Sequence, residues 1–255
     1  MAPRAADELL RAAGGGLTAP LEGRTALVTG ASRGIGAATA RSLAALGARV
    51  LLVSRGVGPL RSLADALGQG AIAFRIDLVE PAAAQRLSLL VRESIGGAPD
   101  IVVHAAGTFP MSAIEAVTDD ELDTALALNV AAPLRLTRAF LAAMRIRGSG
   151  HVVTIGSVAD RSTFPSNAAY AASKHAVRAV HETLRAETRG TGIRATLVSP
   201  AATDTALWDE HDPDASAHLP SRHEMLRPED VAEAVAWAVS RPAHVDVEEI
   251  RLARS

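Results

Sequence analysis

The sequence predicts an α/β fold in which a doubly wound, mostly parallel sheet of about seven strands is flanked by helices. Three observations support this prediction. Short aliphatic runs alternate with longer stretches of helical periodicity along the 255 residues. The aliphatic runs are apolar almost throughout, which is typical of strands that are covered on both faces. The stretches between them are long enough to form the crossover connections that parallel strands require.

Seven runs are expected to form the strands. Most of them are rich in Val, Ile, Leu or Ala, and several end in a glycine or a small polar residue. In chain order they are 24–30, 49–55, 71–76, 100–107, 151–157, 193–200 and 247–253.

The intervening stretches predict helices. An alanine-rich pattern after residue 30 is closed by Gly47, Thr118 and Glu121 form a capping box, and R-P-E-D places a proline in the first turn of the final helix. The remaining helices are expected at 57–67, 80–95, 119–147 with a break before Pro133, 167–189, and from 227 onward.

No repeat or linker divides the chain, so residues 22–255 are expected to form a single domain. Residues 203–226 lack periodicity and are too long for a simple connection, which predicts a mobile lid over a substrate. Residues 1–21 are expected to be a mobile arm with one short helical turn. A docking or oligomer-contact role is the alternative for this arm.

Composition excludes several classes of protein. The apolar fraction of 48% and charged fraction of 21% are those of a globular protein. The net charge of −2 provides no global attraction to nucleic acid or anionic membranes. The absence of cysteine excludes disulfide scaffolds, thiolate metal sites and cysteine nucleophiles. No apolar run of about 18 residues occurs, so no membrane span is expected, and the N-terminus does not have the pattern of a secretory signal.

A glycine-rich turn follows the first predicted strand. In T-G-A-S-R-G-I-G (29–36), Gly30 permits a tight turn. Gly34 and Gly36 remove side chains where the backbone approaches a pyrophosphate and where the helix packs on the strand. The start of the helix then offers free N–H groups to phosphates. An ordinary turn is the alternative, but the position between strand and helix favours dinucleotide binding.

The end of the second strand distinguishes the two nicotinamide cofactors. An acidic residue there would bind a ribose 2′-hydroxyl and repel a 2′-phosphate. This strand ends in Val53-Ser54-Arg55, and Arg33 lies in the glycine turn. Two guanidinium groups suit a phosphate, which predicts NADP(H) over NAD(H). The alternative is a pair of solvated surface arginines.

Two further positions are expected to contact the adenosine. Asp77 follows the third strand, where its carboxylate could accept from the adenine amino group; a plain helix cap is the alternative. Gly107 would let the adenine or ribose lie against the backbone.

The sequence contains one tyrosine, Tyr170, and one lysine, Lys174, against 25 arginines. Four residues apart on a helix, the two share a face. A free tyrosine has a pKa near 10, and an ammonium within about 4–6 Å can lower that pKa by 1–3 units. The pair therefore predicts a proton-transfer site. The alternative, a core tyrosine and a solvated lysine, is weakened because the chain uses arginine at every other strongly basic position.

Several motifs occur together in this sequence. They are T-G-A-S-R-G-I-G (29–36), Asp77, A-A-G (105–107), Asn129, Ser157, Y-A-A-S-K (170–174), Pro200 and Thr205. Together they resemble the common form of the short-chain dehydrogenase/reductase family over residues 22–252. The resemblance implies a Rossmann-like domain and hydride transfer between a nicotinamide and a carbonyl or alcohol carbon.

The resemblance also implies a catalytic tetrad. Tyr170 would protonate the carbonyl oxygen, which Ser157 would hold by a hydrogen bond. Lys174 would bind the nicotinamide ribose and lower the pKa of Tyr170. Asn129 would fix a water that resupplies the proton. The alternatives are a turn residue at Ser157 and a helix-weakening polar residue at Asn129.

The expected cofactor-binding set combines these motifs, with Pro200 and Thr205 near the carboxamide of the nicotinamide. Its members are Gly30, Ser32, Arg33, Gly34, Ile35, Gly36, Ser54, Arg55, Asp77, Leu78, Ala105, Ala106, Gly107, Asn129, Tyr170, Lys174, Pro200, Thr203 and Thr205.

Two positions depart from the family pattern. His104 and Ala105 stand where two asparagines are frequent, and His104 is expected to make structural hydrogen bonds between strands. Ala201 stands where glycine usually follows the proline. Its effect on the loop over the nicotinamide is left open.

The substrate is less defined by the sequence. Leu207, Trp208 and 109–111 could provide an apolar wall. The lid histidines, His211, His218 and His223, have spacings that fit no compact metal site, so no metal is expected. The expected function is therefore an NADP(H)-dependent carbonyl reductase or alcohol dehydrogenase in the cytoplasm. A non-catalytic cofactor-binding sensor or scaffold is the alternative, and an epimerase or dehydratase is a further one.

The alanine- and leucine-rich helices at 119–147 and 167–189 predict a homotetramer, or failing that a dimer. One face of each helix must cover the sheet, and a monomer would leave the remainder exposed. The family resemblance points to contacts between the same two helices of neighbouring subunits. The competing interpretation is that alanine is tolerated on a surface without a partner.

Overall fold

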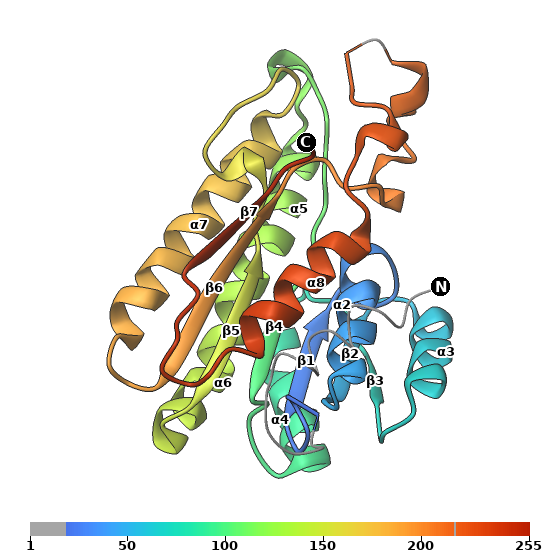
Figure 1. Ribbon diagram of the computed structural model, residues 1–255. Coiled ribbons are helices and arrows are strands. Elements are labelled where there is room, and N and C mark those ends of the chain that lie inside the picture. Colours follow the sequence, from blue (N-terminus) through green and yellow to red (C-terminus); the bar gives the residue numbers. More distant parts are fainter. Residues whose placement is uncertain (1–18, 217) are drawn as a thin grey trace.

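A computed structural model describes residues 19–216 and 218–255, and it contains a seven-stranded sheet (Figure 1). All strand pairs are parallel, in the order β3-β2-β1-β4-β5-β6-β7. The strands are β1 (Thr25–Thr29), β2 (Arg49–Ser54), β3 (Ile72–Arg75), β4 (Ile101–His104), β5 (Gly150–Ile155), β6 (Ile193–Pro200) and β7 (Glu249–Leu252). The order reverses beside β1, as in doubly wound folds, which confirms the predicted fold class.

Helices cover both faces of the sheet. Their bounds are α2 (Gly34–Ala45), α3 (Val57–Leu67), α4 (Ala83–Ile95), α5 (Asp119–Leu126), α6 (Ala132–Arg147), α7 (Ala168–Thr188) and α8 (Pro228–Val239). Core residues of α2, α3 and α8 form one hydrophobic cluster, whereas those of α4, α6 and α7 form another. Strand β1 shows the reason: Ala26 and Val28 belong to the first cluster and Leu27 to the second, because successive side chains point to opposite faces.

Several predicted elements are shorter in the structure, among them one helix and one strand whose ends differ by three residues. The helix expected from residue 80 begins at Ala83. The strand expected over 100–107 ends at His104. The hydroxyl of Thr29 accepts hydrogen bonds from the N–H groups of Ala105 and Ala106, at 3.0 and 3.1 Å. These bonds turn the chain away from the sheet at the edge where the glycine turn lies.

The break expected before Pro133 is a π-helical segment, Ala127–Ala131, between α5 and α6. Pro133 itself lies in the first turn of α6, where a missing N–H is harmless. The whole helical stretch Asp119–Arg147 is long and apolar enough to cross a membrane by length and composition. It forms part of a layer on the sheet, with Leu136, Phe140 and Met144 in the core, and core helices pass the same test.

Most of the predicted N-terminal arm lies outside the described residues. From residue 19 onward, the chain packs against the domain. Leu21 is buried, and its N–H donates to the carbonyl of Leu46 at 2.8 Å.

Candidate active site

A cleft of about 510 Å³ lies where the glycine turn meets the ends of β1, β2 and β4. Most of the predicted cofactor-binding residues line it. These are Gly30, Ser32, Arg33, Gly34, Ile35, Gly36, Ser54, Arg55, Asp77, Leu78, Ala105, Ala106, Gly107 and Thr205. The lining also includes Leu207, which was expected in the apolar substrate wall. It further includes residues that the sequence did not single out, namely Gly56, Pro59, Ile76, Val79, Leu128 and Ala206.

The glycine turn is a cradle that side chains would fill. Gly30 has a φ of +68°, and a Cβ there would lie 2.8 Å from the carbonyl oxygen of Ala105. A Cβ at Gly36 would collide with the Gly30 carbonyl, so α2 can approach β1 this closely only with glycine. Gly34 has a φ of +54° and faces the methyl group of Thr205. These residues fit the pyrophosphate of a dinucleotide, whose approach requires bare backbone.

Two exposed arginines lie on the adenosine side of the cleft. Arg33 precedes α2, and Arg55 follows β2. Among residues 19–216 and 218–255, no carboxylate lies within 4.0 Å of either guanidinium. Both groups are thus available to a phosphate.

Asp77 is a turn residue as well as a cleft residue. Its carboxylate accepts from the N–H of Val79 at 3.1 Å, which is the capping interaction considered from the sequence. Within the described residues its other carboxylate oxygen has no hydrogen-bond donor, and Asp77 lines the cleft. Capping and adenine recognition are therefore compatible.

Three members of the predicted tetrad meet around the end of β5. Ser157 directly precedes a 3-10 turn (Val158–Asp160), and Tyr170 and Lys174 lie one turn apart on α7. The ammonium of Lys174 is 5.5 Å from the centroid of the Tyr170 ring and donates to the carbonyl of Ile155 at 3.0 Å. Lys174 is buried and Tyr170 is half-buried.

The pKa of Tyr170 is raised, whereas the sequence predicted that it would be lowered. Burial, the largest cause, and the Asp160 carboxylate raise it, and a hydrogen bond with Ser157 lowers it. The net result is a rise from 10.0 to about 12. Burial also lowers the pKa of Lys174 from 10.5 to about 8. Near its pKa the lysine is only partly charged, and its ammonium is held by the Ile155 carbonyl. In the protein alone, burial therefore outweighs the effect of the lysine on the phenol.

Asn129 lies in the π-helical segment rather than in a regular helix. Its amide oxygen accepts from the N–H of Thr108 at 2.9 Å, and its amide nitrogen donates to Thr108 O and Ser173 Oγ. The side chain thus ties the loop after β4 to α7. Single-turn π-helical segments of this kind occur frequently at functional sites.

A buried carboxylate behind Ser157 was missed by the sequence analysis. Asp160 accepts hydrogen bonds from Ser199 Oγ, from Arg161 Nε at 2.9 Å and from the Ser157 N–H at 3.4 Å. Burial alone would raise the pKa of Asp160, but the hydrogen bonds from Ser199 and Arg161 hold it below its usual range. The S-V-A-D spacing, a capping pattern, is the signal that could have identified it.

This carboxylate belongs to a larger ion-pair network. Arg178 on α7 lies 3.6 Å from Asp160 and 3.4 Å from Glu249 on β7, and Arg161 also pairs with Glu249. Gly156 is required beside this network, because a Cβ there would lie 2.6 Å from the Asp160 carboxylate. The network joins the turn of Ser157 to α7 and β7.

Aromatic side chains pack around Tyr170, and two of them, Phe109 and Trp208, belong to the predicted apolar wall. The Phe109 ring lies edge-on to Tyr170 with centroids 4.7 Å apart, and Trp208 lies 4.8 Å from Phe109. Trp208 belongs to a 3-10 turn (Ala206–Trp208) of the predicted lid, which rises beyond the carboxyl edge of the sheet in Figure 1. His211 contacts Phe109, and within the described residues no group of three His, Asp or Glu side chains is placed to hold a metal.

Five predicted cofactor-binding residues are not in the cleft lining, namely Asn129, Tyr170 and Lys174, described above, and Pro200 and Thr203. Pro200 ends β6, and Thr203 is buried, with its hydroxyl donating to the carbonyl of Ala201 at 3.0 Å. The carbonyl of Thr203 accepts from the indole N–H of Trp208 at 3.1 Å. In this structure Thr203 therefore anchors the lid.

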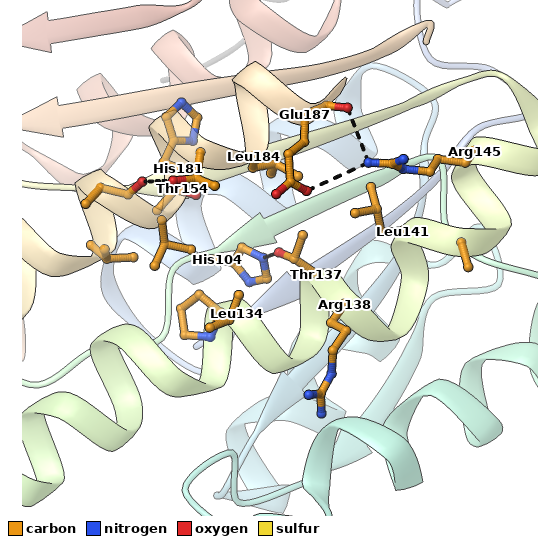
Figure 2. A pocket seen from close by; sticks show the side chains of 16 residues that line it. His104, Leu134, Thr137, Arg138, Leu141, Arg145, Thr154, His181, Leu184 and Glu187 are labelled. Atoms are coloured by element: carbon orange, nitrogen blue, oxygen red, sulfur yellow. Dashed lines mark hydrogen bonds and ion pairs between the residues drawn. The ribbon is translucent and has the colours of Figure 1, made fainter. Parts of the chain in front are cut away.

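A second hollow of about 640 Å³ lies between α6 and α7, away from the glycine turn (Figure 2). Its lining includes Leu134, Leu141 and Leu184, and the Arg145–Glu187 pair crosses one end. His104 lies at its floor and bonds the hydroxyl of Thr137 on α6 at 2.9 Å. The expected strand-to-strand bond of His104 is therefore a strand-to-helix bond, because the side chain points out of the sheet toward α6.

Comparison with known proteins decides the family. The family model described as short chain dehydrogenase matches residues 24–216. The chain belongs to the short-chain dehydrogenase family. It is similar to an uncharacterized oxidoreductase of Staphylococcus aureus strain N315, with 34% identity over 90% of this chain and 96% of that protein.

Two more relatives of this short-chain dehydrogenase carry a chemical description. A solved structure described as a metagenomic short-chain oxidoreductase in complex with NADP shares 31% identity, with a TM-score of 0.80 over 92% of this chain and 99% of that one. Glycine betaine reductase ATRR of Emericella nidulans is 37% identical over 91% of this chain but only 19% of its own length. Membership of the family makes the chain an oxidoreductase with a Rossmann-like fold that acts on small molecules.

Proposed function

We propose that this short-chain dehydrogenase transfers a hydride between NADP(H) and a carbonyl or secondary-alcohol carbon of a small substrate. The observation that carries the proposal is the placement of the sequence's one tyrosine and one lysine. Both lie on α7 near the end of β5, at the carboxyl edge of the sheet where the glycine cradle lies. A cofactor-binding scaffold without turnover would have no need for this pair.

The chain's own residues account for proton transfer and orientation. The cofactor, when bound, supplies or accepts the hydride. Tyr170, whose raised pKa keeps it protonated at neutral pH, donates a proton to the carbonyl oxygen. Ser157 orients that oxygen by a hydrogen bond. Lys174 is placed to bind the ribose and to restore the phenolic proton, and Asn129 to hold a water in that relay.

Preference for NADP(H) is supported by Arg33 and Arg55. Strand β2 ends in Ser54 without a carboxylate, and both guanidinium groups line the cleft. A 2′-phosphate would find two positive charges there, whereas a 2′-hydroxyl would find no carboxylate acceptor. The NADP complex of the metagenomic relative agrees with this proposal.

The working environment is proposed to be the cytoplasm, where NADP(H) is available to such an enzyme. The substrates in the names of related proteins differ, and glycine betaine is one of them. The names therefore support the reaction type more strongly than any single substrate.

Replacement of Tyr170 by phenylalanine tests the reaction. A panel of aldehydes and ketones is supplied with NADPH, and consumption of NADPH is followed by its absorbance. Tyr170→Phe should lower kcat by about 10²- to 10⁴-fold, because only the proton donor is lost. NADPH affinity should be nearly unchanged. A variant that retains more than about a tenth of kcat on a good substrate contradicts Tyr170 as the acid.

A further inference from the structure

Aromatic residues are rare in this chain, yet several of them lie together around Tyr170. The sequence has seven aromatic residues, four Phe, two Trp and one Tyr, and three of them meet here. Phe109 lies between the Tyr170 and Trp208 rings, and its centroid is 5.3 Å from that of His211. The side chains packed against the Tyr170 ring are thus largely aromatic.

Hydrogen bonds from side chains to backbone carbonyls hold the His211 and Trp208 rings in place. The His211 ring bonds the carbonyl of Phe109 at 3.1 Å, and the Trp208 indole donates to Thr203 O. The lid and the loop after β4 therefore close together over Tyr170. A substrate group that enters between them replaces contacts between aromatic rings.

Charge in the same region is negative. Within W-D-E-H-D (208–212), Asp209, Glu210 and Asp212 are all exposed. The guanidinium of Arg222 is held by Asp204 and Asp209, each at 2.6 Å.

The other loop arginine is also engaged, since Arg161 pairs with Asp160 and Glu249. Among the described residues of the loops 108–113, 156–167 and 201–226, no guanidinium remains free for an anionic substrate. Beyond these loops, Arg254 near the chain's end acts on Glu224.

We propose that the site takes small carbonyl compounds and alcohols that carry a quaternary ammonium group, held against Phe109 and Trp208. Aromatic faces attract such cations, more strongly when the cation is desolvated, and the lid carboxylates add long-range attraction. Carboxylate substrates meet repulsion and no partner. This inference rests on the proposed hydride transfer at the same site.

The redox step leaves the ammonium group unchanged. In the reducing direction the carbonyl carbon gains a hydride from the reduced nicotinamide, and the oxygen gains a proton from Tyr170. The C=O π bond is lost, one C–H and one O–H bond form, and the nicotinamide is oxidised. The ammonium group serves recognition only.

Binding can be measured without turnover by tryptophan fluorescence, because the chain has only two tryptophans. Trp237 lies on α8, is 43% exposed and stacks on Arg241, outside the proposed site. Trp237→Phe leaves Trp208 as the sole indole reporter. With NADPH present, which cannot accept a hydride from an alcohol, the variant is titrated with choline and with 3,3-dimethylbutan-1-ol, which has the same shape without the charge.

Choline should change the Trp208 fluorescence saturably, with a Kd about tenfold or more below that of the neutral alcohol. Equal or tighter binding of the neutral alcohol overturns the inference. A Trp208 signal that does not respond to choline overturns it as well.

Turnover provides a second test that separates the two proposals. Betaine aldehyde, its uncharged isostere 3,3-dimethylbutanal and the anionic 4-oxobutanoate are compared by kcat/KM with NADPH. The ammonium aldehyde should be preferred over the isostere by about tenfold, and the anion should be the poorest substrate. Preference for the isostere or the anion overturns the ammonium inference but leaves the oxidoreductase proposal intact. If no carbonyl compound is reduced, the proposed function fails, and the fluorescence titration still decides the inference.

Ring variants identify the source of the preference. Trp208→Leu and Phe109→Leu should each reduce the ratio between ammonium aldehyde and isostere by several-fold, with thermal unfolding measured to confirm folding. Trp237→Phe is the matched control and should keep the wild-type ratio. A ratio that survives both ring variants contradicts recognition by these rings.

Discussion

At the scale of single residues, Asp160 is the feature that most changes the expected site. It is a fully buried carboxylate that contacts the backbone of Ser157 and pairs with two arginines. Its charge raises the pKa values of both Tyr170 and Lys174. Asp160 therefore favours the protonated forms of Tyr170, the proposed acid, and of Lys174, which makes it a positioning residue in the proposed reaction.

Asp160→Asn tests this positioning role. Removal of the negative charge should lower the pKa of Tyr170, so the high-pH fall of kcat/KM for carbonyl reduction should move to lower pH. NADPH affinity should change little. The readout is the pH profile of kcat/KM, together with thermal unfolding.

Asp100→Asn is the matched control for that variant. Asp100 also accepts from a backbone N–H, that of Thr25, and pairs with Arg24, but it precedes β4 at the opposite edge of the sheet. It should leave the profile in place. A profile that is unmoved in Asp160→Asn, or moved equally in both variants, contradicts the role of Asp160.

Arg55 provides a second prediction at this scale. Arg55→Asp places a carboxylate at the end of β2, where a 2′-phosphate would lie. The variant should bind NADPH at least about tenfold more weakly, because a charge-assisted contact is replaced by repulsion. NADH binding should be spared. Titration with both cofactors measures this, and wild-type protein that uses NADH and NADPH equally well would show the assignment to be wrong.

At the scale of elements, three histidines are buried where β4, β5 and α7 meet the rest of the core. Burial lowers the pKa of His104 to about 4, that of His151 to about 3 and that of His181 to about 4, from 6.5. Because the folded pKa values are depressed, the unfolded chain binds more protons below pH 6.5. Stability should therefore be complete above pH 6.5 and fall as the pH decreases.

Denaturant unfolding at pH 7.5, 6.5 and 5.0 measures this loss. Each histidine should contribute up to about 2 kcal/mol between pH 6.5 and 5, above the range in which most carboxylates titrate. His181→Leu should reduce the pH dependence by about one third, since one of three groups is removed. His244→Gln, at an exposed position, is the control and should leave it unchanged. Stability that is flat from pH 7.5 to 5.0 would contradict the prediction.

At the scale of the whole molecule, the hollow between α6 and α7 bears on assembly. It is lined largely by apolar groups, and Leu134 on its rim is 48% exposed. Closed two-fold symmetry makes such a surface self-complementary. The homotetramer, or failing that a dimer, stays a prediction, and this surface is where we expect the contact.

Sedimentation equilibrium at micromolar concentration should show a mass of four or two chains. Leu134→Asp should shift the mass toward the monomer, because it places a charge in an apolar contact. Leu89→Asp on α4, which is similarly exposed, should not. Wild-type protein that sediments at the mass of a single chain contradicts the assembly.

Much of the fold and the cofactor cleft could be predicted from local sequence. Strand β2 and helix α3 match the expected ranges closely, because an apolar run and a 3.6-residue period are local signals. Glycine spacing identified the cradle for the same reason. The Asp160 network could not be predicted, because it depends on side chains from β6, α7 and β7 meeting behind β5. The pKa of Tyr170 was misjudged because burial depends on the complete fold.

The burial of Lys174 has a consequence for covalent labelling. The ε-amino group of Lys174 is the only one in the sequence, and its pKa of about 8 leaves a substantial neutral, nucleophilic fraction at mildly alkaline pH. Apart from any N-terminal amine, a reductive-methylation or acylating reagent has one amine to modify. Thiol reagents have no target, because the sequence contains no cysteine. Because Lys174 is only 7% exposed, the rate at which label is incorporated would report how often the site opens to the reagent, and a ligand bound beside the lysine would slow it.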